Sequence, residues 1–177
     1  ARLSGVKPLE WIASFYVWII RGTPLLVQLF IIFYGLPSVG ITIPPFPSAV
    51  IGFTLSVGAY NSEIIRAAIL SIPKGQWEAA SSIGMTYGQS LRRIILPQAT
   101  RVAVPPLGNS FISLVKDTSL AAIITVVELF RVSQQIVATN YEPLIMYMEA
   151  AVIYLIFSTV LSYFQGRMEK RFGRYVA

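Results

Sequence analysis

Long apolar stretches, separated by short polar or proline-rich segments, dominate the pattern of the chain. No Asp, Glu, Lys or Arg occurs from Gly22 through Ser62, and one membrane-spanning helix needs about 20 apolar residues. This stretch is therefore long enough for two crossings, and the prolines and glycines from Leu36 to Pro47 predict the turn between them. The apolar stretches from about Pro97 to Val115 and from about Pro143 to Gly166 predict two more crossings.

An arginine interrupts the first apolar stretch. Trp11 to Ile20 is already apolar, but an Arg at the centre of one continuous spanning helix would cost about 2.5–3.5 kcal/mol. A crossing that begins near Arg21 avoids this cost, with Pro24 in its first turn, where the missing N–H is harmless. Trp11 to Ile20 is then a partly interfacial helix, and the second crossing runs from about Pro47 to Leu70. The sequence thus predicts four crossings, with both ends on one side.

Lysine and arginine set the orientation of this arrangement. Twelve of the 14 basic residues fall on one face: Arg2, Lys7, Arg21, Arg66, Lys74, Arg92, Arg93, Arg101, Arg167, Lys170, Arg171 and Arg174. Only Lys116 and Arg131 fall on the other. Cytoplasmic loops of membrane proteins are enriched in Lys and Arg. The net charge of +6 therefore indicates orientation in a lipid bilayer and argues against nucleic acid as a partner.

The composition supports the membrane and excludes several chemistries. Hydrophobic residues make up 55% of the 177 residues and charged residues only 12%, about half the charged share of soluble domains. The chain has no Cys and no His. Disulfides, thiolate metal sites and Ser–His or Cys–His nucleophile pairs are therefore excluded. The chain opens on Ala1 without an initiator Met, so we expect a fragment whose upstream part is absent.

The segment of about residues 72–97 is long for a connection between two crossings. Gln76 to Ile83 contains good helix formers, and Gly84 follows as a C-terminal stop. Thr86 then stands as the N-cap of a second short helix. We expect a compact helix–glycine–helix unit at the cytoplasmic surface. The simpler alternative is an ordinary amphipathic surface loop.

This helix–glycine–helix unit carries a recognisable signature. Its spacing is Glu-Ala-Ala, three residues, Gly, nine residues and Ile-x-Leu-Pro, matched by Glu78, Ala79, Ala80, Gly84, Ile94, Leu96 and Pro97. At these residues the chain resembles the membrane subunits of bacterial ABC importers. Segments 21–26 (RGTPLL) and 109–120 (NSFISLVKDTSL) are similar to those of the polar amino-acid branch, and within it the chain looks most like L-cystine permeases.

The resemblance implies a fold, a function and a set of partners. The fold is an all-α, polytopic transmembrane bundle of the type I importer permeases, one permease domain over residues 1–177, with the first of the branch's usual five helices missing. The function is ATP-driven import of a polar amino acid, possibly cystine. The partners are a second, identical or similar permease subunit, two cytoplasmic ATPase subunits and an extracytoplasmic solute-binding protein. The chain itself is not an enzyme and holds no cofactor, because ATP and Mg belong to the ATPase.

The resemblance also implies that the helix–glycine–helix unit of about residues 72–97 couples the permease to the ATPase, and we name it the coupling segment. Glu78 would offer a carboxylate to a basic groove of the ATPase, Ala79 and Ala80 would permit close approach, and Gly84 would supply the bend. The sequence agrees with an external energy source, because the chain contains no G-x-x-x-x-G-K-[ST] phosphate loop.

Ionisable and small polar residues within the crossings are the candidates for a substrate pathway. Glu63 and Arg66 lie three apart in the second crossing, where charge is expensive. Gly52, Ser56, Ala59 and Glu63 share one helical face, which would pack closely on another helix or line a path. The alternative for Glu63 is an ion pair with Arg66 that serves folding alone.

The end of the third crossing offers a second group of candidates. Lys116 and Asp117 follow Asn109, Ser110 and Ser113, and such a pair could complement both charges of an amino acid. Lys116 and Asp117 could instead neutralise each other or cap the segment that follows them.

Two other functions remain open on the sequence alone. An ion-driven secondary transporter would need midplane carboxylates and usually internal repeats; Glu63 is the only such carboxylate, and no convincing repeat is present. A non-transporting membrane scaffold that recruits an ATPase is the second alternative.

Overall fold

The computed structural model describes residues 2–173, and every regular element within them is helical. The elements are α1 (Lys7–Gly22), α2 (Leu25–Phe30), the π-turn η1 (Ile31–Gly35), the 3-10 turn η2 (Leu36–Val39), α3 (Pro45–Leu70), α4 (Lys74–Ser82), α5 (Tyr87–Ser90), the π-turn η3 (Leu91–Ile95), α6 (Leu96–Asp117), the 3-10 turn η4 (Thr118–Ile124), α7 (Leu129–Asn140) and α8 (Pro143–Gly173). The predicted all-α class is confirmed. Ala1 and Arg174, which the sequence analysis used, lie outside the described residues.

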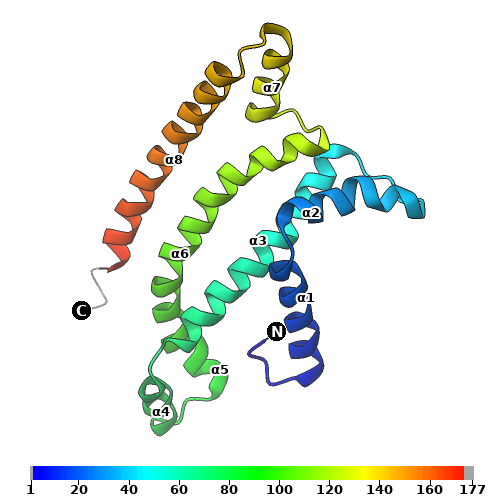
Figure 1. Ribbon diagram of the computed structural model, residues 1–177. Helices are drawn as coiled ribbons and strands as arrows, with labels where there is room; N and C mark the ends of the chain where they lie inside the picture. Colours follow the sequence, from blue (N-terminus) through cyan, green and yellow to red (C-terminus); the bar gives the residue numbers. More distant parts are fainter. Residues whose placement is uncertain (1, 174–177) are drawn as a thin grey trace.

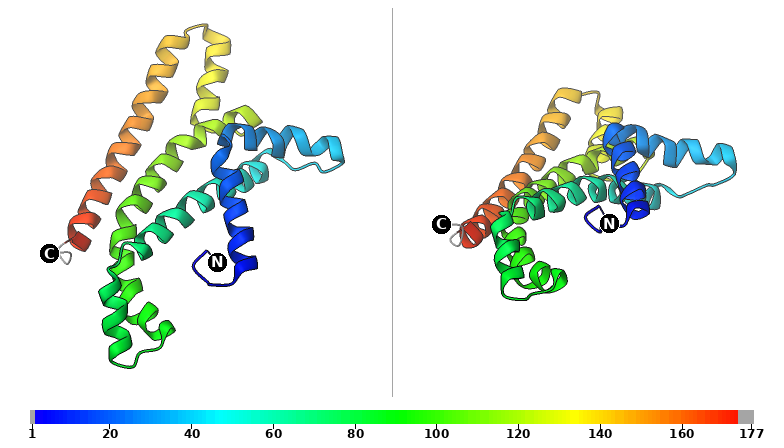
Figure 2. Two further views of the ribbon diagram at one scale, coloured as in Figure 1. Left: turned by 60° about the horizontal axis from the view of Figure 1, so that its bottom comes forward. Right: turned by 90° about the horizontal axis from the view of Figure 1, so that it is seen from below.

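The long helices form an open fan rather than a closed bundle (Figure 1). Helix α6 packs between α3 and α8, α1 packs on the other side of α3, and α7 folds back along α8. The short helices α4 and α5 project beyond the ends of α3 and α6 (Figures 1 and 2). The start of α1 and the end of α8 point to the same side as α4 and α5, and α7 lies on the opposite side. The described part of the chain therefore begins and ends on the side predicted to be cytoplasmic.

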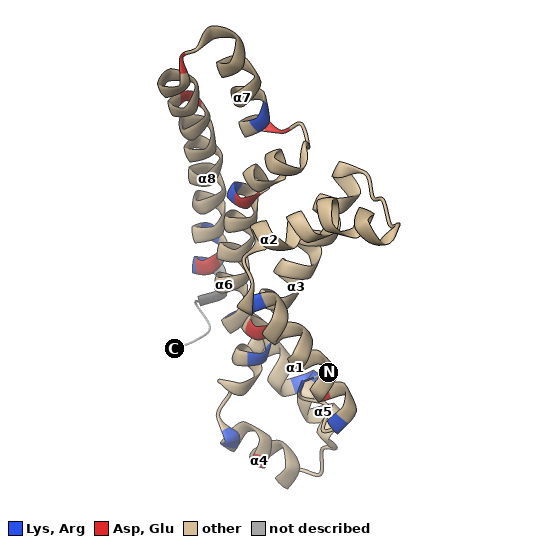
Figure 3. Ribbon diagram, turned by 45° about the vertical axis from the view of Figure 1, so that its right-hand side comes forward, with Lys and Arg blue, Asp and Glu red and all other residues tan. Residues whose placement is uncertain are grey.

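The charge distribution follows the same division. Lys and Arg gather in the half of the molecule that contains the start of α1, α4 and the end of α8 (Figure 3). Few basic residues lie near α7 at the opposite end. This is the asymmetry that orients membrane proteins with their basic loops in the cytoplasm.

The first predicted crossing is wrong in its start and in its shape. Helix α1 runs through the Trp11–Ile20 stretch and ends at Gly22, and the helical turns of residues 25–39 leave it at 102°. Thr23 and Pro24 are extended, because a proline disfavours helical conformation in the residue before it. The Gln28 side-chain amide donates to the Ile20 carbonyl oxygen at 2.8 Å, which satisfies one of the carbonyls left free at the end of α1.

The other predicted crossings differ in whether their helices are long and apolar enough to span a membrane. Among residues 2–173, α8 over Pro143–Lys170 is the only single helix both long and apolar enough to cross a membrane. Two bent pairs raise the number to at most three: residues 7–22 with 25–39, and 87–124 with 129–140. Helix α3 forms over Pro45–Leu70 as expected, but polar residues in its second half exclude it from this set.

Small residues hold the helices close together. Gly52 and Ala59 on the predicted stripe of α3 are buried. A Cβ atom on Gly52 would lie 2.6 Å from the Leu29 Cδ2 atom, so α2 contacts the α3 backbone directly. In contrast, most apolar side chains of α8 are exposed, including Leu155 at 65%. An apolar surface of this kind suits contact with lipid.

Candidate functional site: coupling segment and polar cavity

The coupling segment folds as a helix, a glycine bend and a second helix. Helix α4 ends in a Schellman motif, in which the Gly84 N–H donates to the Ser81 carbonyl oxygen at 2.9 Å and the Met85 N–H donates to that of Ala80 at 3.1 Å. Gly84 has a φ of +80°, the left-handed conformation that glycine adopts without strain. Thr86 caps α5 through a reciprocal capping box with Gln89. The predicted glycine stop and threonine cap are both present.

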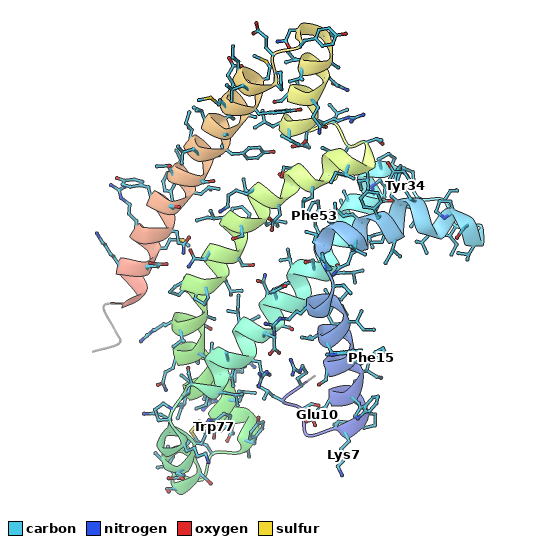
Figure 4. All side chains as sticks on the ribbon, in the orientation of Figure 1. Lys7, Glu10, Phe15, Tyr34, Phe53 and Trp77 are labelled. Atoms are coloured by element: carbon cyan, nitrogen blue, oxygen red, sulfur yellow. The ribbon has the colours of Figure 1, made fainter. Side chains whose placement is uncertain are left out.

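An aromatic stack ties the two short helices together. The Trp77 ring of α4 stacks on the Tyr87 ring of α5, with centroids 5.1 Å apart and an angle of 17° between the rings. Trp77 also packs against the buried cluster that includes Ile95 and Ala99 at the start of α6 (Figure 4). This stack was not predicted, since the two aromatics lie ten residues apart on either side of the bend and share no helical period.

The signature residues divide into an exposed and a packed group. Glu78 and Ala79 are exposed on α4, whereas Ala80 is 1% exposed and packs within its own chain. Ile94 packs against the cluster beneath the segment. Leu96 and Pro97 open α6, where a proline needs no hydrogen-bond partner. A partner can therefore approach Ala79 closely, but it cannot contact Ala80.

A polar cavity of about 480 Å³ lies between α3, α6 and the break that precedes α2. Four of the predicted pathway residues line it: Ser56, Asn109, Ser113 and Asp117. Thr23, Tyr60 and Ser110 contribute further polar groups. Hydroxyl, amide and carboxylate groups thus converge in one hollow, and we name it the α3–α6 cavity.

The structure places the other two predicted pathway residues elsewhere. Lys116 lines a separate hollow against α8, together with Ser119 and Tyr154. Lys116 and Asp117 therefore face different spaces and do not form one receptor for both charges of an amino acid. The Asp117 side chain also makes no capping hydrogen bond to η4.

Glu63 is the centre of an ionic cluster. Its carboxylate accepts from Arg66 at 3.1 Å, lies 3.6 Å from the Arg21 guanidinium and forms an ion pair with Arg2. Its side chain is 18% exposed. The pairing with Arg66 that was left as an alternative is present. Arg21 joins it from α1 and Arg2 from the turn that precedes α1. Residues of both signs lie together in this part of the molecule (Figure 3).

Two amides that support the cavity were missed. The buried Gln165 side chain of α8 donates to the Asn109 Oδ1 atom at 3.0 Å and to the Pro105 carbonyl oxygen at 3.1 Å. Ser110 donates to the Asn61 Oδ1 atom of α3 at 2.7 Å. Asn109 is therefore fixed from α8. The available signal was Gly108 beside Asn109, since only a glycine leaves room for the Gln165 side chain.

The family of the chain can be decided by comparison with known proteins. The family model described as "Binding-protein-dependent transport system inner membrane component" matches residues 1–174. The chain belongs to this family. It is accordingly a membrane-located permease subunit of an ABC importer. It is not itself an enzyme, because ATP hydrolysis takes place on a separate ATPase subunit. Members of the family assemble with an ATPase and a binding protein.

Two similar proteins are amino-acid permeases, which indicates the branch of the family to which the chain belongs. It is 62% identical to the L-cystine transport system permease protein TcyB of Bacillus subtilis (strain 168), over 100% of this chain and 76% of that protein. It is 42% identical to the glutamine transport system permease protein GlnP of Escherichia coli (strain K12), over 97% and 79%. The crystal structure of an amino acid ABC transporter with histidines matches with a TM-score of 0.92 and 38% identity, over 96% and 79%. The predicted polar amino-acid branch, the likeness to cystine permeases and the type I permease fold are confirmed.

We expect Gly108→Ala to disturb the support of Asn109. The new Cβ atom would lie 2.9 Å from the Gln165 Cδ atom, so the Gln165 side chain must move and release Asn109. Overpacking of this kind costs about 1–3 kcal/mol, and the thermal unfolding midpoint in detergent should fall accordingly. Gly166→Ala is the matched control, because a Cβ atom there meets nothing within 4 Å. Equal midpoints for the two variants would contradict the assignment.

Proposed function

We propose that the chain is a multi-pass subunit of the bacterial cytoplasmic membrane that translocates an amino acid, L-cystine first among the candidates. The observation that carries the proposal is the α3–α6 cavity, from here on named the substrate cavity, which Asp117 on α6 and Ser56 on α3 both line. A carboxylate pairs with an ammonium group, while hydroxyl and amide groups donate to a carboxylate. The volume of about 480 Å³ lies in the range of small-molecule sites. The 62% identity to the cystine permease supports cystine.

The coupling segment is the proposed contact with the ATPase. It projects beyond the long helices (Figure 2) and exposes the Glu78 carboxylate. We infer that two ATPase subunits, with ATP and Mg²⁺ bound in their own sites, hold two permease subunits through this segment. An extracytoplasmic binding protein delivers the substrate on the side of α7. Glu78, Ala79, Gly84 and the turn of residues 94–97 form the contact and its support.

A displacement of the coupling segment can reach the substrate cavity along a short stretch of chain. The coupling segment continues through η3 directly into α6, and α6 contributes Asn109, Ser113 and Asp117 to the cavity. When the ATPases close on ATP, a displacement of the segment tilts α6 against α3. No covalent step occurs in this chain, and the ATPase cycle shifts the populations of inward-open and outward-open states.

The alternatives from the sequence are less well supported. An ion-driven transporter needs an available midplane carboxylate, but Glu63 is held by three arginines. A non-transporting scaffold would not need a polar cavity supported by hydrogen bonds from α8. Membership of the binding-protein-dependent transport family agrees with neither alternative.

The test is uptake by the full-length importer, reconstituted in liposomes with its ATPase and binding protein. We expect ATP-dependent uptake of L-cystine, and Ser113→Leu should reduce it by about tenfold or more, because the larger side chain fills the cavity. Ser119→Leu, in the hollow against α8, is the control. Uptake without ATP would identify an ion-driven transporter. ATPase docking without flux of cystine, glutamine or histidine would identify a scaffold.

A further inference from the structure

A second cavity adjoins the substrate cavity. It measures about 430 Å³ and is lined by Arg2, Ser14, Trp18, Arg21, Tyr60 and Glu63 among others. We name it the inner cavity, because it lies along α1, whose first residue is on the side of the coupling segment. Tyr60 lines both cavities. One side chain therefore stands at the boundary between the two spaces.

Tyr60 is held by charge rather than by tight packing. The Arg21 guanidinium carbon lies 5.3 Å from the centroid of the Tyr60 ring, within the range of a cation–π contact. Arg21 is in turn 3.6 Å from the Glu63 carboxylate. Tyr60 is 46% exposed, so its ring has room to change rotamer. The position of the ring thus depends on the Glu63 cluster.

The break in the chain between α1 and α2 lies at the same boundary. Gly22 lines the inner cavity, and the next two residues, Thr23 and Pro24, line the substrate cavity. A Cβ atom on Gly22 would meet nothing within 4 Å, so no neighbouring atoms pack against this side of the backbone. A few residues at the ends of elements are the usual hinges of gating motions. Arg21 is attached to this break and moves with it.

The inner cavity also has the charge expected of an exit for an anionic group. Two of the three guanidinium groups around Glu63, those of Arg2 and Arg21, line this cavity together with the Glu63 carboxylate, which leaves one positive charge in excess. The side chain of Arg21 is 43% exposed, so it can pair with a passing carboxylate.

We propose that Tyr60, held by Arg21 and Glu63, gates the substrate cavity on its cytoplasmic side, and that the inner cavity is the exit vestibule that receives the carboxylate of the amino acid. This inference rests on the proposed function. The gate opens when the break at residues 23–24 swings α1, which draws Arg21 away from the Tyr60 ring.

Cysteine accessibility can test the gate, because the chain contains no cysteine. Ser113→Cys reports on the substrate cavity and Ser14→Cys on the inner cavity. The complete importer, without nucleotide, is placed in inside-out vesicles, and a charged, membrane-impermeant thiol reagent is added from the cytoplasmic side. We expect Tyr60→Ala to raise the modification rate at position 113 by about tenfold and to leave the rate at position 14 unchanged. Tyr60→Phe keeps the ring, so the modification rates at both positions should equal those of the parent.

The outcomes separate the gate from the proposed function. Equal rates at position 113 with and without the Tyr60 ring would overturn the gate, even if amino-acid uptake is normal. A failure of the parent importer to take up any amino acid would overturn the proposed function, while the accessibility experiment would still judge the gate. If Tyr60→Ala does not assemble with the ATPase, Tyr60→Leu removes the ring and keeps most of the volume.

Discussion

A Gly84→Val variant will dock to the ATPase about 5–30-fold more weakly than the parent, because a β-branched residue at a φ of +80° costs about 1–2 kcal/mol or more of backbone strain. The strain falls on the bend that joins α4 to α5, so the exposed face of α4 is no longer presented at its angle. ATP-driven uptake should fall with docking. Co-purification of the permease with the ATPase and uptake in liposomes measure the two effects.

Four further variants separate the effect of the bend from general damage to the segment. Gly84→Asn should retain most docking, since Asn tolerates the left-handed conformation. Gly75→Ala and Gly88→Ala place a Cβ atom in open space and should be neutral. Glu78→Lys leaves the bend intact and reverses the exposed charge, so its docking should also weaken. Normal docking of both Gly84→Val and Glu78→Lys would refute the coupling assignment.

Removal of the Glu63 carboxylate should destabilise the contact of α1 with α3. In Glu63→Ala the guanidinium groups of Arg2, Arg21 and Arg66 lose their shared partner and repel one another. Hydrogen bonds to charged groups contribute about 1.5–3 kcal/mol, which lowers the thermal midpoint of a chain of this size by about 3–10 °C. Unfolding of the purified chain in detergent, followed by circular dichroism, measures the shift.

The control for Glu63 is Glu149→Ala on α8, where the side chain is exposed and has no ion-pair partner among the described side chains of residues 2–170. Its midpoint should stay near that of the parent. An unchanged midpoint for Glu63→Ala, combined with lost uptake, would show that Glu63 acts on the substrate rather than on the fold.

Local chemistry explains which parts of the site could be predicted. The bend at Gly84 and the cap at Thr86 follow from hydrogen bonds between residues at most five apart. Asn109, Ser113 and Asp117 follow one another at intervals of four, so the helical period alone places them on one face of α6. The structure adds Ser56 from α3 to the same cavity, as its place on the small-residue stripe suggested.

The parts of the site that were not predicted depend on how helices distant in the sequence cross one another. The Arg2–Glu63 pair spans 61 residues, and its formation depends on the packing of α1 on α3, which no local pattern encodes. The bend of 102° after Gly22 was missed because the proline was placed inside a helix rather than at its break. The contact of Gln165 with Asn109 depends likewise on the approach of α8 to α6.

The ionic cluster makes the chain unequally tolerant of genetic change. Three cations share one anion, so the loss of any one of Arg2, Arg21 or Arg66 leaves two that still neutralise Glu63. No other acid among residues 2–173 pairs with these arginines. Each of the three basic residues can therefore be substituted singly, whereas no other residue can replace the Glu63 carboxylate. Among functional variants selected after random mutagenesis, substitutions should be rarer at Glu63 than at its three partners.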